Sequence, residues 1–283
     1  FFFDLIFNTV EGRRGCACEA FYPSLFEELG YPYSGSDGYT LTVTLDKWMT
    51  KLVLAAHGID SPRGRLLTPR DVPELTRGEG SLNVPLPALI KPNYEGSSKG
   101  ITDDSVVRDS KALRAVCLRM LEQYPQGVLV EEFIPGIDIT VPFIEGLAAE
   151  HEGVLLPVEY VIDPAARSRF NIHDYRLKNR DSARVQARAP ANLPRDVLAR
   201  LRALIRTAVR VLGLRDVARV DFRLAEDGRI YFLEVNALPS LEPGVGIFAA
   251  TKREGLSYDE TILAVLRSAA LRWKLPLPTQ VSA

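Results

Sequence analysis

The stretch RVDFRLAEDGRIYFLEVN, residues 219–236, contains two apolar runs joined by a tight turn. Residues 217–224 and 229–235 are rich in β-branched and aromatic side chains, and the Asp-Gly pair between them is typical of a β-hairpin. The sequence therefore predicts two antiparallel strands. Their pairing would place Asp221 and Glu234 next to each other on one face of a sheet.

Asp221, Glu234 and Asn236 form a candidate metal site. Glu234 and Asn236 are two residues apart and therefore share a face of their strand. Two carboxylates and an amide oxygen are ligands that Mg²⁺ or Mn²⁺ accepts when phosphates and waters complete the shell. The alternative is a set of solvated surface charges. We favour the metal site because Glu234 lies within an apolar run, where a carboxylate requires a partner.

Upstream, the stretch KPNYEGSSKG, residues 91–100, follows a predicted strand at 88–92. Backbone N–H groups and hydroxyls of such a loop can fold over a phosphate chain while Lys91 contacts it from below. The order of residues is not that of a P-loop, and no helix follows directly. An ordinary flexible hairpin loop fits this stretch equally well.

The stretch EEFIPGID, residues 131–138, combines a predicted strand with a Pro-Gly turn. The free edge of such a strand can pair with an adenine ring, and Asp138 can accept hydrogen bonds from ribose hydroxyls. Many strands followed by turns share this pattern, so the motif is weak when taken alone.

The remaining pattern alternates apolar runs with helical periods and predicts a mixed α/β (α+β) protein. The segment 61–87 is rich in proline and predicts a connection between two lobes, with room for a short helix. A Ser257/Glu260 capping box predicts a last helix that ends near residue 272. The other predicted helices are 22–29, 46–57, 109–124 and 194–212, and the other predicted strands are 2–7, 128–134, 138–145 and 154–162.

Taken in order, these motifs resemble the ATP-grasp superfamily and, within it, the D-alanine-D-alanine ligase group. The resemblance covers nearly the whole chain. It implies two α+β lobes that clasp ATP, preceded by an N-terminal α/β substrate domain that is truncated here. The expected boundaries are 1–46 for the N-terminal domain, 47–137 for the central lobe and 138–283 for the C-terminal lobe.

The resemblance also implies a nucleotide site. Lys47 and Lys91 would hold the α- and β-phosphates, Lys178 the γ-phosphate, and Asp138 the ribose, where the ligases more usually carry Glu. The remaining nucleotide contacts would be Glu95, Gly96, Ser97 and Ser98 in the loop over the triphosphate, and Glu131, Glu132, Phe133 and Ile134 around the adenine.

The implied reaction is an ATP-dependent ligation of a carboxylate to an amine through an acyl phosphate. Arg219, Lys178 and Ser98 would act at the reacting groups, and Arg219 would steady the acyl phosphate and the oxyanion. Since little covalent chemistry falls to the protein, cations must neutralise the phosphoryl charge and hold the nucleophile in line. Asp221, Glu234 and Asn236 match the family's magnesium ligands.

The acceptor side departs from the family pattern. The ligases follow the magnesium Asn with T-x-P-G and later a Ser, whereas this chain has Ser240 at the Gly position and Val245 or Gly246 near the Ser position. Glu11 stands in a segment that replaces the family's His-Gly. With these four residues as the substrate candidates, we expect a different amino acid or peptide as acceptor. A genuine D-alanine-D-alanine ligase of cell-wall synthesis and a non-catalytic ATP-binding regulatory protein remain alternatives.

The composition of the 283-residue chain limits which kinds of binding partner are expected. The net charge is −1, with 27 arginines and only 8 lysines. No global field would recruit nucleic acid or a membrane, so we expect small-molecule amino acid or peptide substrates and leave a homodimer open. Three unpaired cysteines, Cys16, Cys18 and Cys117, favour a reduced, cytoplasmic protein. Lys51 and Lys99 match no ligand of the family and are predicted to be surface lysines.

Overall fold

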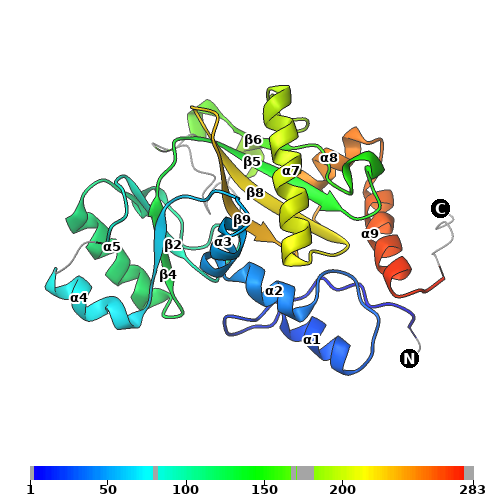
Figure 1. Cartoon of the computed structure of the whole chain (residues 1–283), viewed down its shortest axis with the longest axis horizontal. Helices are drawn as coiled ribbons and strands as arrows, with labels where there is room; N and C mark the ends of the chain where they lie inside the picture. The colour runs from blue at the N-terminus through cyan, green and yellow to red at the C-terminus, as the bar shows by residue number, and fades with distance from the viewer. Residues whose placement is uncertain (1–2, 79–81, 167–169, 171–181, 277–283) are drawn as a thin grey trace.

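The computed structural model describes residues 3–78, 82–166, 170 and 182–276. Two lobes, each built on an antiparallel sheet, lie side by side, and an N-terminal segment packs under the larger one (Figure 1). The architecture agrees with the predicted mixture of α and β structure.

The smaller lobe is a four-stranded sheet in the order β1-β4-β2-β3. Its apolar face packs against two helices, and the buried cluster includes Ile90, Val130 and Met120. The elements are β1 (Gly64–Leu67), a 3-10 turn (Pro69–Asp71), α4 (Val72–Arg77), β2 (Ala88–Pro92), β3 (Val106–Val107), α5 (Ser110–Gln123) and β4 (Val128–Glu132).

The larger lobe is a five-stranded sheet in the order β7-β6-β5-β8-β9. Helix α7 (Arg195–Leu212) crosses one face of it, with a stripe of apolar residues turned to the strands (Figure 1). Gly213 ends this helix in the left-handed conformation, with φ 69°. The strands are β5 (Gly136–Ile144), β6 (Val158–Ile162), β7 (Val185–Arg188), β8 (Val217–Ala225) and β9 (Ile230–Asn236).

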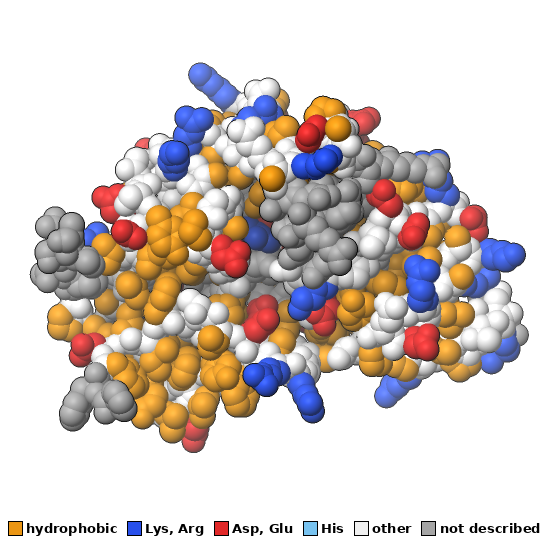
Figure 2. Space-filling model, turned by 180° about the vertical axis from the view of Figure 1, so that it is seen from behind, with side chains coloured by type: hydrophobic (Ala, Val, Ile, Leu, Met, Phe, Trp, Pro, Cys, Tyr) orange, Lys and Arg blue, Asp and Glu red, His pale blue; other side chains and the backbone are white. Residues whose placement is uncertain are grey.

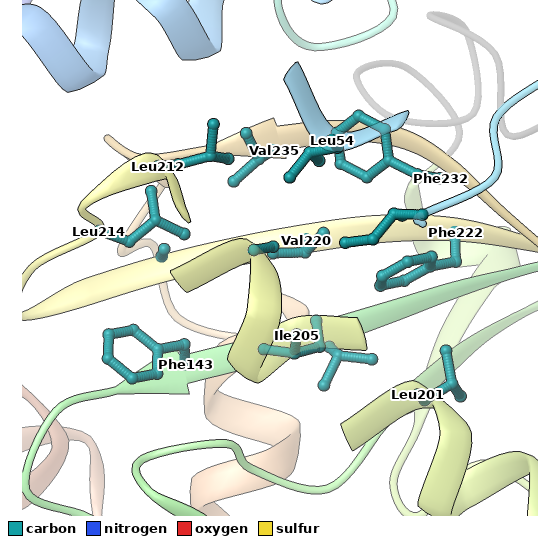
Figure 3. Close-up of a cluster of buried hydrophobic side chains, with 14 of the residues drawn as sticks. Leu54, Phe143, Leu201, Ile205, Leu212, Leu214, Val220, Phe222, Phe232 and Val235 are labelled. Atoms are coloured by element: carbon teal, nitrogen blue, oxygen red, sulfur yellow. The ribbon is translucent and has the colours of Figure 1, made fainter. Parts of the chain in front are cut away.

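The core of this lobe lies between α7 and the sheet. Figure 3 shows Leu201 and Ile205 of α7 near Val220 and Phe222 of β8, with Leu54 of α3 on the same cluster. Since side chains alternate along a strand, burying Val220 and Phe222 on this face turns the residues between and beside them to the opposite face. That opposite face carries the polar residues described below.

Five further α-helices lie in the described part of the chain. They are α1 (Phe21–Glu28), α2 (Gly38–Leu45), α3 (Lys47–Ala55), α8 (Gly246–Arg253) and α9 (Tyr258–Arg272). The N-terminal segment is joined to α9 through Asp216, which is fully buried and accepts hydrogen bonds from Gly35 N at 2.8 Å, Ser268 Oγ at 2.7 Å and Arg272 Nη2 at 2.6 Å. This shared carboxylate fixes the Gly35 turn against the large sheet.

Most predicted elements are confirmed within a few residues, among them the 217–235 hairpin, α7 and the capping box of α9. The predicted strand 2–7 is wrong for its described residues, because Ile6 forms only one isolated bridge, to Tyr33. The predicted helix 46–57 begins after a separate helix, α2, that was missed. Asp46 divides the two helices because its carboxylate caps the next one at Met49 N.

No helix among the described residues is both long and apolar enough to cross a membrane. Exposed hydrophobic side chains gather on α1 and the segments beside it, at the lower left of Figure 2. They include Phe3, Phe21, Leu25, Leu29 and Tyr31.

Candidate active site

A cavity of about 2160 Å³ lies between the two lobes and the N-terminal segment. It is larger than the few hundred to about 1,000 Å³ that one small molecule usually occupies. Residues from β2, β4, β5, β6, β8 and β9 line it, together with the loop that follows β2 and the segment that precedes α8. The volume leaves room for a nucleotide and further substrates together.

The polar face of the large sheet forms one wall of this cavity. Asp221 of β8 is paired with Glu234 of β9, as the hairpin predicted. Arg219 is paired with Asn236. A register shift follows Asp221, since the next pair, Phe222 and Phe232, leaves one residue of β9 unpaired. Bulges of this kind are common beside functional sites because they re-aim side chains.

Asp221 is the most heavily bonded residue of this wall. Arg219 donates to it from Nε at 3.0 Å and from Nη2 at 2.8 Å, and Thr140 Oγ1 donates at 2.7 Å. Asn236 Nδ2 lies 3.4 Å from the same carboxylate. Burial would lower the pKa of Arg219, but Asp221, Tyr160 and Glu234 together outweigh burial and raise this pKa, so the arginine remains a fixed cation.

Lys47 brings a second cation to the wall from the N-terminus of α3. Its Nζ lies 3.2 Å from Glu234 Oε2 and donates to the carbonyl of Glu95 at 2.7 Å. Asp46 holds the start of this helix, since it also accepts from Asn93 Nδ2 at 2.7 Å and from Tyr94 OH at 2.9 Å. Lys47 therefore reaches both the phosphate-loop candidate and the metal-site candidate.

The set Asp221, Glu234 and Asn236 has the chemistry that a hard divalent cation requires. All three supply oxygen atoms, and two are anionic. The described residues contain no group of three His, Cys, Asp or Glu residues suited to a metal, so a cation here would depend on the amide and on oxygens from outside the protein. Phosphate groups are the natural source of such oxygens.

The prediction that Lys51 is a surface lysine is wrong. Only 3% of its side chain is exposed, and its Nζ lies 3.1 Å from Glu131 Oε2 and donates to the carbonyl of Phe232 at 3.1 Å. Lys91 Nζ lies 2.6 Å from the other oxygen of Glu131. Burial lowers the pKa of Lys51 to about 8.

Two lysines thus share one buried carboxylate under the cavity. Burial would raise the pKa of Glu131, but Lys51 and Lys91 outweigh burial and lower it, so the group remains ionised. Both oxygens of Glu131 face lysines, which differs from the adenine contact expected of it. The spacing of Lys47 and Lys51, one helical turn apart, is the signal in the sequence that could have identified Lys51.

The loop after β2 has an unusual backbone. Ser97 and Ser98 have φ values of 54° and 56°, a left-handed conformation that costs energy for residues other than glycine. Such strain is concentrated at functional loops. Glu95 pairs with Lys99 at 3.3 Å on the surface, which agrees with the prediction for Lys99.

At the other end of the cavity, Asp138 pairs with a residue that the sequence reasoning missed. Arg223 Nη1 lies 2.8 Å from Asp138 Oδ1, and its Nε donates to the carbonyl of Ile134 at 2.9 Å. The guanidinium lies 5.6 Å from the centre of the Phe133 ring. Arg223 comes two residues after Asp221 and therefore lies on the same face of β8. This two-residue spacing is the signal in the sequence that could have identified Arg223.

The predicted acceptor residues lie around the start of α8. Val245 is the N-cap residue, and Gly246 is buried at the first helical position. Ser240 accepts from the backbone N–H of Glu242 at 3.3 Å. All three residues lie close to the cavity, and Val245 and Ser240 line it.

Glu11 and Glu19 line the N-terminal side of the cavity, and the charges of Glu11, Lys47 and Glu234 act on Glu19. Burial, Glu11 and Glu234 raise the pKa of Glu19 to about 7, against an opposing effect of Lys47. Glu19 was not predicted. Lys178 lies outside the described residues, so its role stays a prediction.

Two kinds of comparison identify the family. The family described as "D-ala D-ala ligase C-terminus" matches residues 56–267. A D-alanine–D-alanine ligase of Aromatoleum aromaticum is 34% identical over 270 residues, which are 95% of this chain and 80% of that protein. The chain belongs to the D-alanine–D-alanine ligase family. D-alanine–D-alanine ligase B of Chromobacterium violaceum is also similar, 33% identical over 93% of this chain and 80% of the relative.

Solved structures of D-alanine ligases have the same ATP-grasp fold. The VanG D-Ala:D-Ser ligase of Enterococcus faecalis aligns with a TM-score of 0.76 and 24% identity, over 94% of this chain and 73% of that one. A D-alanine–D-alanine ligase of Bacillus anthracis, solved in complex with ATP, aligns with a TM-score of 0.71 and 22% identity, over 96% and 80% of the two chains. Membership of the family makes this chain a carbon–nitrogen ligase.

Proposed function

We propose that this D-alanine–D-alanine ligase family member joins the carboxylate of one amino acid to the amine of a second amino acid or peptide, with ATP converted to ADP. The observation that carries the proposal is the convergence of Lys47 and Arg219 on Glu234 and Asp221 at the wall of one cavity. Fixed cations beside a carboxylate pair suit the transfer of a phosphoryl group.

In the proposed first step, a donor carboxylate oxygen attacks the γ-phosphorus of ATP, and ADP leaves. Lys47 and Lys91 neutralise the charge of the phosphates, and the strained Ser97-Ser98 turn covers them and excludes water. A bound Mg²⁺ held by Asp221, Glu234 and Asn236 would supply further charge neutralisation. Lys51 acts through Glu131, which holds Lys91 in place.

In the proposed second step, the acceptor amine attacks the acyl carbon and phosphate leaves. Arg219 is oriented by its two bonds to Asp221 and presents a permanent positive charge to the developing oxyanion. Because the reacting acyl phosphate would otherwise hydrolyse, the exclusion of water from the cavity is as important as the charges.

For the acceptor, we propose an amino acid or peptide other than D-alanine. Val245 and Gly246 stand where a serine hydroxyl would face the acceptor in the family pattern, and neither offers a side-chain hydrogen bond. The names of the relatives instead favour D-alanine on both sides of the bond.

An ADP-release screen across D- and L-amino acids and dipeptides, with the product mass determined, separates these alternatives. Amide formed only with acceptors other than D-alanine supports the proposal, and D-alanyl-D-alanine as the main product overturns the acceptor assignment. ATP binding with no ADP release across the panel would instead indicate a non-catalytic regulatory protein. Val245→Ser should change the acceptor profile and leave the KM for ATP unchanged.

A further inference from the structure

Tyr160 of β6 lies on the cavity wall, although no motif in the sequence singled it out. Its side chain lines the same cavity as Arg219 and Val245. Burial raises the pKa of its phenol, with Arg219 and Asp221 acting on it in opposite directions. The phenol therefore lies near the predicted catalytic arginine and one of the predicted metal ligands. Tyr160 therefore stands between the reacting groups and the start of α8.

The phenol hydroxyl is in close contact with Gly246. A Cβ atom at position 246 would lie 2.7 Å from the Tyr160 hydroxyl oxygen, closer than real Cβ contacts, and 3.5 Å from Thr140 Cγ2. Gly246 does not have a positive φ, so its backbone conformation does not require glycine. The hydroxyl of Tyr160 is what leaves no room for a side chain there.

Hydrogen bonds connect Tyr160 to the start of α8 and to β5. Its oxygen is bonded to the backbone N–H of Gly246 and to the Thr140 hydroxyl. Thr140 donates its one hydroxyl hydrogen to Asp221 Oδ1 at 2.7 Å, so the phenol is the donor toward Thr140. The result is a continuous path from the start of α8 through Tyr160 and Thr140 to Asp221.

We propose that Tyr160 is a specificity-determining residue for the acceptor: its ring closes the acceptor pocket beside Val245, and its hydroxyl sets the position of Gly246 relative to Asp221. This inference rests on the proposed ligase function and deepens it. A bulky wall at this point limits the acceptor to a small side chain. The path meets the proposed metal site at Asp221, whereas Lys91 and Asp138 are bonded to other residues, Glu131 and Arg223.

Steady-state kinetics of Tyr160→Phe give the first test. Loss of the hydroxyl should raise the KM for the acceptor about tenfold, the equivalent of about one hydrogen bond, while the KM for ATP changes by less than about twofold. Tyr160→Ala should in addition admit acceptors with larger side chains. Tyr33→Phe is the matched control, because it removes a phenol hydroxyl that bonds Glu27 at 2.7 Å away from the cavity.

A double variant tests the contact itself. Gly246→Ala should lower the melting temperature and raise the KM for the acceptor, because the new methyl group meets the phenol oxygen. Adding Tyr160→Phe removes that oxygen and should restore much of the melting temperature. If Gly246→Ala lowers the melting temperature equally with and without Tyr160→Phe, the proposed contact between Gly246 and the Tyr160 hydroxyl is overturned.

The outcomes distinguish this inference from the function on which it rests. If the unaltered protein forms no amide with any amino acid pair, the proposed function fails. If it forms amide normally and Tyr160→Phe changes the KM for ATP, or leaves the KM for the acceptor unchanged, the function stands and the role of Tyr160 is overturned.

Discussion

Lys47 Nζ lies 3.2 Å from Glu234 Oε2, so a helix of the N-terminal region contacts a candidate metal ligand on the last strand of the large sheet. The same lysine bonds the carbonyl of Glu95 at the phosphate loop. The phosphate-loop and metal-site candidates, represented by Glu95 and Glu234, are 139 residues apart in the chain and thus meet at one ammonium group.

Replacement of Lys47 tests whether its ammonium group belongs to the active site. Lys47→Met should reduce ADP formation at least about a hundredfold, because removal of one preorganised charge from a phosphoryl-transfer site commonly costs this much. ADP release under saturating amino acids is the measurement. Lys111→Met, at an exposed position of α5, is the control and should retain normal turnover. Normal turnover of Lys47→Met would exclude the lysine from the site.

Glu234→Gln addresses the metal-site candidate. The amide retains the size of the carboxylate but loses its charge, so we expect ADP formation to fall about a hundredfold or more and the Mg²⁺ concentration for half-maximal activity to rise. A Mg²⁺ titration of both proteins measures this, and circular dichroism checks that the fold is retained. An unchanged Mg²⁺ requirement would remove Glu234 from the proposed ligands.

The buried pair of lysines on Glu131 makes a stability prediction. Lys51→Met leaves one oxygen of a fully buried carboxylate without its cation, and breaking a buried ion pair in this way costs about 3 kcal/mol of the free energy of unfolding. Urea unfolding of the variant and of the unaltered protein measures the difference. A loss no larger than that of the exposed Lys111→Met would show that Lys51 is dispensable.

Glu19 gives a pH-dependent prediction. Its pKa is raised to about 7 in the folded protein, above the ordinary value of 4.5, so the folded state binds this proton more tightly than the unfolded chain. Its contribution therefore favours folding below pH 4.5 and is lost as the pH rises to 7.

Glu19→Gln should accordingly raise the melting temperature at pH 8 and have little effect at pH 4. Melting curves without nucleotide at the two pH values measure this. Glu28→Gln, on the exposed side of α1, is the control. An equal effect of Glu19→Gln at both pH values would contradict the raised pKa.

Much of this arrangement could be predicted because local patterns determine it. The hairpin pattern of residues 217–235 predicted Asp221 beside Glu234, and the pairing of these two residues is confirmed. The register shift that brings Glu234 rather than Leu233 opposite Asp221 is not visible in the alternation. Family resemblance added the ATP-grasp fold, which the solved structures bear out. The domain boundaries and the roles assigned to individual residues remain predictions.

The contacts that the sequence did not reveal are those made between distant elements. Lys51 was predicted to be a surface lysine because it matched no ligand of the family, yet it is paired with Glu131 of β4, 80 residues further along the chain. Tyr160 and Gly246 meet across 86 residues, and Arg223 binds Asp138 across 85. Periodicity within one strand or helix carries no information about such pairs.

The central claim is that ligation proceeds through an acyl phosphate, and transfer of an isotope tests it most directly. The donor amino acid is labelled with ¹⁸O in its carboxylate, the reaction is run with ATP and an accepted amine, and the released phosphate is analysed by mass spectrometry. The account predicts one ¹⁸O atom in each phosphate released, because the attacking carboxylate oxygen leaves with the phosphorus. Amide formation with unlabelled phosphate would contradict it.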